Sequence, residues 1–254
     1  MESRRLLAKV GLITDFLSYG GTALLGMLLI PLYLGHINQA VYGFWLTAGS
    51  ILAYMGLMEF GVGIALTQRV SSLSKDSTGT IIDINSANEL ISTAFYLSVA
   101  IGFLFFSVGW GLSLYAPKLT KIPLAFQGDV ANALRIVTLA MGISFPLGVF
   151  PAFINGVNRM AWVNGMVLLS NGTGLFLSWM LCVKGYGITG LAVAQGTQVL
   201  LVGLMGIFFV KYKYSSISIT ISNVRIEKIR SLWSYGGYFQ MGRIANIVAM
   251  NTDP

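Results

Sequence analysis

The sequence contains little charge and almost no cysteine or histidine. Asp, Glu, Lys and Arg make up only 10% of its 254 residues, whereas soluble domains carry about a quarter. With 55% hydrophobic residues and a mean hydropathy of +0.75, this shortage excludes an ordinary cytosolic enzyme, a disordered chain and a nucleic-acid-binding domain. One cysteine, Cys182, and one histidine, His36, exclude a disulfide framework, an iron–sulfur centre and a zinc site with several Cys or His ligands. We expect no metal and no cofactor.

Long apolar runs dominate the chain. A membrane-spanning helix needs about 20 mostly apolar residues. Runs of this kind predict helices at roughly 11–34, 41–64, 88–116, 131–154, 161–183 and 187–210. A seventh run begins near 233 and is still apolar at Pro254. The fold class predicted is therefore an all-α polytopic membrane protein, with six complete transmembrane helices and the start of a seventh.

The basic residues lie mainly on one side of the predicted membrane. Lys and Arg accumulate in the cytoplasmic loops of membrane proteins. If the N-terminus (residues 1–10) is cytoplasmic, that side holds Arg4, Arg5, Lys9, Arg69, Lys75, Arg159, Lys211, Lys213, Arg225, Lys228 and Arg230. The opposite side holds Lys118, Lys121 and Lys184. The bias predicts a cytoplasmic N-terminus and a basic cytoplasmic loop at 211–232.

A short internal repeat suggests a duplicated architecture. The tetrapeptide at 18–21, Ser-Tyr-Gly-Gly, recurs at 234–237, once in the first predicted span and once in the seventh. Many transporters are built from two related halves. We therefore expect the chain to be the N-terminal part of a longer transporter, with a six-helix half at 11–210 and the truncated start of the second half at 233–254.

Three motifs in the first two spans resemble those of a known family. They are Ile30-Pro31-Leu32-Tyr33-Leu34-Gly35, Tyr42-Gly43-Phe44-Trp45 and Gly56-Leu57-Met58-Glu59-Phe60-Gly61-Val62-Gly63. The chain resembles the polysaccharide flippases, which export O-antigen and capsule repeat units and belong to the multidrug/oligosaccharidyl-lipid/polysaccharide exporter superfamily. The segment 239–253 also resembles the seventh span of that family. Glu59 departs from the pattern, because many relatives have Asp there.

The resemblance implies a transporter and not an enzyme. Such proteins move oligosaccharide repeat units linked to undecaprenyl diphosphate from the cytoplasmic to the periplasmic leaflet of the bacterial inner membrane. The implied partners are this lipid-linked oligosaccharide, membrane lipids and other polysaccharide assembly proteins, with no nucleic acid. One alternative is a multidrug/cation antiporter of the same superfamily. A membrane-embedded glycan polymerase or ligase is a further alternative, but the predicted outer loops are short.

Two arginines inside the spans are candidate substrate ligands. Arg243 lies roughly 15 Å into the seventh predicted span, where an arginine must face protein or water rather than lipid. It either binds the substrate diphosphate in a cavity or pairs with an acid on a neighbouring helix. Arg135 is predicted one turn inside the fourth span. It either lines the exit vestibule or extends to the headgroups.

Three carboxylates are candidates for ion coupling or gating. Asp253 would be a proton or cation site, or a partner for a residue in the second half. Asp15 and Glu59 lie toward the cytoplasmic ends of the first two spans. Each is either a coupling or gating carboxylate or a residue that reaches interfacial water.

The charge distribution makes a prediction about topology. Reporter fusions after Lys75 and after Lys213 should report a cytoplasmic location, and a fusion after Lys121 a periplasmic one, because eight more basic residues lie on the first side. A periplasmic signal at Lys75 would contradict the predicted helix count.

Overall fold

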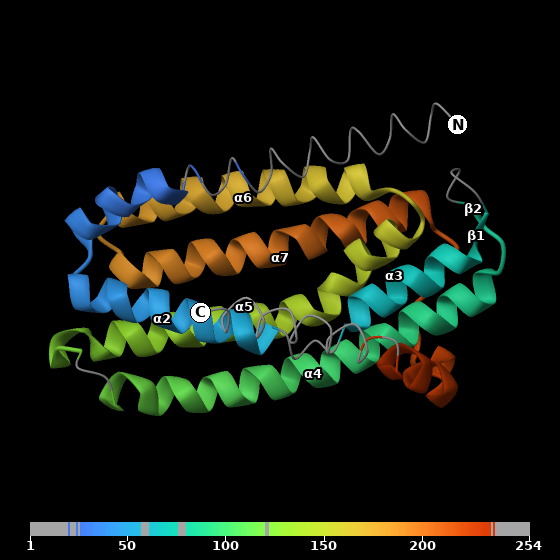
Figure 1. The fold of residues 1–254 in the computed structure, drawn as a ribbon, viewed down its shortest axis with the longest axis horizontal. Helices are drawn as coiled ribbons and strands as arrows, with labels where there is room; N and C mark the ends of the chain where they lie inside the picture. The colour runs from blue at the N-terminus through green and yellow to red at the C-terminus, as the bar shows by residue number, and fades with distance from the viewer. Residues whose placement is uncertain are drawn as a thin grey trace, which may run out of the picture.

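The computed structural model describes residues 20, 24, 26–56, 61–75, 80–119, 122–234 and 236 (Figure 1). After a helix at Gly26–His36, the labelled helices are α2 (Gln39–Gly56), α3 (Val62–Leu73), α4 (Ile84–Leu119), α5 (Leu124–Gly156), α6 (Met160–Val183) and α7 (Gly187–Lys213). Two short antiparallel strands, β1 (Ser74–Lys75) and β2 (Thr80–Ile81), join α3 to α4. A 3-10 turn, η3 (Ile221–Asn223), precedes a last helical segment from 226.

The long helices lie side by side along one axis (Figure 1). Within the described residues, the four helices α4, α5, α6 and α7 are long and apolar enough to cross a membrane. The described connector residues 74–75, 80–83, 157–159 and 214–225 lie at one end of the bundle, and 37–38, 122–123 and 184–186 lie at the other (Figure 1). The helices therefore alternate in direction as a multi-pass membrane protein requires.

The second predicted span, 41–64, is wrong as one continuous helix. The structure has α2 ending at Gly56 and a separate α3 beginning at Val62. Gly61 precedes α3 with a φ of 68°, a left-handed conformation that interrupts a right-handed helix. α3 then continues to Leu73, beyond the predicted end of the second span at 64. Six complete spans are therefore not established.

The other long helices extend beyond their predicted ends. α4 begins at Ile84 rather than 88, and α5 begins at Leu124 rather than 131. Polar residues lower the hydropathy of these ends, so the apolar runs alone place the helix starts too late. The same polar residues can stabilise a helix end. The Asp83 carboxylate accepts the Ser86 amide at 3.0 Å, which caps the start of α4. Donation by the Ser86 side chain and amide lowers the pKa of Asp83. The predicted loop 211–232 likewise contains the end of α7 and the helical residues 226–232.

α5 packs against α3, α4 and α7, and glycines allow its backbone to come close to theirs. Gly102 of α4 lies against the Gly142 carbonyl, and Gly109 against Thr138. On the other side, three glycines of α7 meet α5: Gly196 meets Ala140, Gly203 meets Leu147 and Gly206 meets Phe150 and Pro151. Small residues of this kind drive helix association in membranes, where lipid is as apolar as the side chains.

Two prolines fall inside α5 without ending it. The helix is continuous through Pro146 and Pro151. Because proline has no amide N–H, Pro146 leaves the Gly142 carbonyl without its helical hydrogen bond. That same carbonyl faces Gly102. The missing hydrogen bond therefore coincides with the closest approach of α4.

We predict that Gly102→Ala loosens the α4–α5 contact. A Cβ at Gly102 would overlap the Gly142 carbonyl oxygen, and overpacking of this kind costs about 1–3 kcal/mol. Gly111→Ala in the same helix is the matched control, because a Cβ there meets nothing within 4 Å. Equilibrium unfolding in mixed micelles should show destabilisation only for Gly102→Ala. Equal stabilities of the two variants would contradict the described packing.

Candidate functional site

Of the five predicted site residues, only Arg135 falls in the part of the chain that the structure describes. Asp15, Glu59, Arg243 and Asp253 lie outside the described residues, so their predicted roles stay predictions. The polar contacts that the structure does describe lie between neighbouring helices and at the two ends of the bundle.

Arg135 is held between α4 and α5. Its guanidinium lies over the Trp110 ring, 5.1 Å from the ring centroid. Nε and Nη1 donate long hydrogen bonds, both 3.4 Å, to Ser113 Oγ and Asn132 Oδ1. Because α5 begins at Leu124, Arg135 is about three turns inside the helix rather than one. An aromatic face and two polar partners accommodate the charge there.

A polar cluster joins the middle of α6 to α7. The side-chain amide Nε2 of Gln198 donates to Asn171 Oδ1 at 2.6 Å. The Ser170 hydroxyl donates to the main-chain carbonyl of Gln198. Gly174 leaves room for the Gln198 side chain, since a Cβ there would lie 2.8 Å from its Oε1. Gln198 was missed, although an amide in an otherwise uncharged apolar run is a detectable signal.

Two of the family-like motifs meet at the opposite end of the bundle from the basic connectors. Tyr33 belongs to the first motif and Tyr42 to the second, and their ring centroids are 6.0 Å apart. The Tyr33 hydroxyl is 2.6 Å from Ser178 Oγ of α6, and this hydrogen bond is buried. The contact fixes the helix at 26–36 against α2 and α6.

The connector after α7 is bound along the first turns of α4. Asn88 accepts the Ser218 amide at 2.9 Å, and Ser92, one turn later, accepts the Thr220 amide at 3.2 Å. On the neighbouring face Glu89 pairs with Arg225 at 3.0 Å, and its other oxygen lies 4.0 Å from Lys228. Sequence reasoning missed this set, because its hydrogen-bonded partners are separated by 128 to 136 residues.

The break in the second span contacts the start of the seventh. A Cβ at Gly61 would lie 2.8 Å from both the Cα and the carbonyl oxygen of Gly236. Gly61 lies in the third family-like motif, and Gly236 lies in the repeated tetrapeptide. The two motifs are therefore adjacent in space, at a point where only glycine fits.

No family model and no curated protein sequence matches this chain. Its structure is similar to an outward-facing conformation of a multidrug resistance MATE family transporter of the MOP superfamily, with a TM-score of 0.64 and 14% sequence identity. The match covers 96% of this chain and 52% of that transporter, so the chain spans about half its length. The likeness shows a shared fold. It does not select the polysaccharide branch.

We predict energetic coupling between Asn171 and Gln198. Asn171→Leu should destabilise the protein by about 1 kcal/mol, because it leaves the Gln198 amide without its side-chain acceptor in an apolar interface. In a chain that already carries Asn171→Leu, Gln198→Leu should destabilise the protein less than it does in the otherwise unchanged chain, because it removes an amide that has lost its acceptor. A double-mutant cycle by equilibrium unfolding in mixed micelles measures this. Strictly additive effects would show that the hydrogen bond contributes nothing.

Proposed function

We propose that this chain forms one half of a membrane transporter that works by alternating access between two halves. The observation that carries the proposal is the extent of the structural match, which takes in 96% of this chain but only 52% of the transporter. One half of a protein built from two similar halves would match in this way, almost entirely along its own length and along about half of the whole protein. The repeated tetrapeptide at 18–21 and 234–237 independently supports it.

Two described contacts suit a protein whose halves move relative to each other. The connector at 216–225 is bound to α4 by backbone and side-chain hydrogen bonds, so the segment leading into the second half starts from a defined position. Gly236, which contacts Gly61, follows this connector in the chain. Because both residues are glycines, no side chain there obstructs rotation of one segment against the other. We propose that this pair is a pivot between the halves.

The proposed substrate is an oligosaccharide linked to undecaprenyl diphosphate, moved from the cytoplasmic to the periplasmic leaflet of a bacterial inner membrane. Support comes from the motifs at 30–35, 42–45 and 56–63. In this proposal Arg243 and Arg135 contact the anionic headgroup, because a guanidinium presents a planar fork of donors to phosphate. Asp15, Glu59 and Asp253 are the carboxylates proposed to couple transport to an ion or to gate it.

A multidrug/cation antiporter is the second candidate. It is favoured by the description of the structural neighbour as a multidrug resistance transporter. The two candidates share a fold and differ in cargo: one carries an anionic lipid-linked sugar, the other an organic cation. An experiment must therefore measure both.

The test is deletion of the gene in its own host, followed by complementation with the natural reading frame. Loss and recovery of surface polysaccharide would support the flippase. Unchanged polysaccharide with increased sensitivity to cationic dyes would support the antiporter. A deletion strain with neither change, in a host that makes surface polysaccharide, would contradict both assignments.

For the flippase we predict that Arg243→Ala abolishes surface polysaccharide while the protein reaches the membrane in normal amount. Arg243→Lys should restore part of it, because the charge remains while the bidentate fork is lost. Arg230→Ala is the control, since Arg230 is an exposed cation on the segment that leads into the seventh span. Immunoblots of membranes and surface polysaccharide gels give the readouts. Normal polysaccharide in a stable Arg243→Ala strain would refute the assignment, and loss of the protein in both variants would indicate a structural ion pair.

A further inference from the structure

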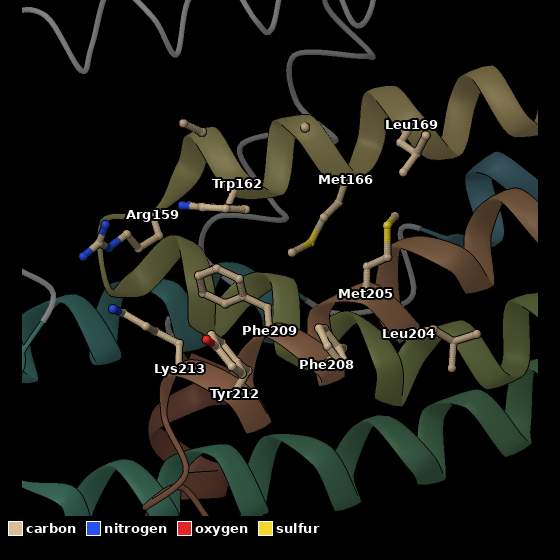
Figure 2. A pocket seen from close by; sticks show the side chains of 12 residues that line it. Arg159, Trp162, Met166, Leu169, Leu204, Met205, Phe208, Phe209, Tyr212 and Lys213 are labelled. Atoms are coloured by element: carbon tan, nitrogen blue, oxygen red, sulfur yellow. The ribbon is translucent and has the colours of Figure 1, made fainter.

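An open apolar groove of about 850 Å³ runs between the first half of α6 and the second half of α7 (Figure 2). Trp162, Met166 and Leu169 line it from α6, and Leu204 and Phe208 line it from α7. Trp162 also packs on Phe209, with ring centroids 5.2 Å apart. Trp162 is 56% exposed and Phe208 is 74% exposed, so large apolar side chains face outward along the groove.

One end of the groove is cationic. Arg159, the residue before α6, and Lys213, the last residue of α7, both line the groove at this end (Figure 2). The start of α6 adds the partial positive charge of a helix N-terminus. These groups lie on the side of the bundle that carries most of the basic residues. The groove thus has a site for an anion at the membrane surface and an apolar channel leading away from it.

The length of the groove matches one leaflet of a bilayer. From Arg159 to Leu169 is ten residues of α6, which is about 15 Å along the helix axis. The hydrocarbon core of a bilayer is about 30 Å thick, so the apolar lining ends near the midplane. A chain that enters from the cationic end therefore belongs to a lipid of that leaflet.

We propose that this groove binds one membrane lipid with an anionic phosphate headgroup. The phosphate lies between Arg159 and Lys213, and one hydrocarbon chain lies along the groove toward Leu169 and Leu204. Basic pockets between transmembrane helices on the cytoplasmic side commonly bind anionic lipid headgroups. The charge at one end, the apolar lining and the one-leaflet length each fit a lipid. The proposal does not depend on which substrate is transported.

The experiment places a fluorescent reporter inside the groove. The full chain with Trp162 as its single tryptophan, the other four replaced by Phe, is reconstituted in vesicles that contain either dibrominated phosphatidylglycerol or dibrominated phosphatidylcholine. Bromine quenches a tryptophan that contacts the lipid chain. A second protein that keeps only Trp179 is the matched control, because Trp179 is on the same helix and 43% exposed but does not line the groove.

We expect Trp162 to be quenched at lower mole fractions of the anionic lipid than of phosphatidylcholine, and Trp179 equally by both. Arg159→Gln and Lys213→Gln should each reduce the preference about fivefold. Lys211→Gln should leave it unchanged, because Lys211 is exposed at the same end and does not line the groove. Unchanged quenching of Trp179 in each variant reports correct insertion.

Three outcomes would overturn the proposal. Equal quenching of Trp162 by both lipids would mean ordinary contact with bulk lipid. An equal loss of preference in Lys211→Gln would mean attraction to the general surface charge rather than a site. Protection of Trp162 from both lipids would mean that protein fills the groove, either residues 1–19 or a second copy of the chain. If the single-tryptophan protein is unstable, the quenching lost on Trp162→Phe in the otherwise unchanged chain gives the same comparison.

Discussion

The close approach of α5 to its neighbours is the contact on which the rest of the bundle depends. In lipid, helices gain little from burying apolar side chains, so association requires backbones near enough for extensive van der Waals contact. Glycines provide this on two sides of α5: Gly102 and Gly109 of α4 on one, and Gly196, Gly203 and Gly206 of α7 on the other. α6 contacts α7 much more than it contacts α5, and the connector 216–225 is in turn bound to α4. Each of these elements is therefore positioned through α5 or a helix packed against it.

Hydropathy predicted α4 to α7 because the cost of an unpaired backbone in lipid forces each long apolar run into a helix. It failed at ends such as Ile84 and Leu124, where the helix continues past its apolar run and polar residues such as Asp83 cap it. It also failed at Gly61, since a glycine in an apolar run gives no sign of whether its φ is positive. Apolar composition predicts whether a segment is buried in lipid or protein. It does not predict the backbone conformation at a single residue, which depends on what packs against that residue.

The candidate site was predictable only in part, for a similar reason. A charge in an apolar run, such as Arg135, is visible in the sequence, but its partners on α4 are not. The pairing of Asn171 with Gln198 was identified only from their hydrogen bond in the structure. The contacts of Glu89 with Arg225 join parts of the chain that no periodicity connects. Sequence thus indicates which polar groups need partners, and the fold decides which partners they find.

The contact between α5 and α7 has a consequence for how the protein is made. The pairs Gly196–Ala140 and Gly203–Leu147 keep the same spacing along both helices, so α5 and α7 run parallel. Parallel helices cannot be joined by a short turn, and here α6 lies between them in the chain. α4 and α5 can associate as a hairpin as soon as both are inserted. The α7 face of α5 must wait until α6 has crossed the membrane and α7 has followed it. During synthesis that face of α5, with Pro151, is exposed to lipid or to the insertion machinery, and α7 completes the bundle.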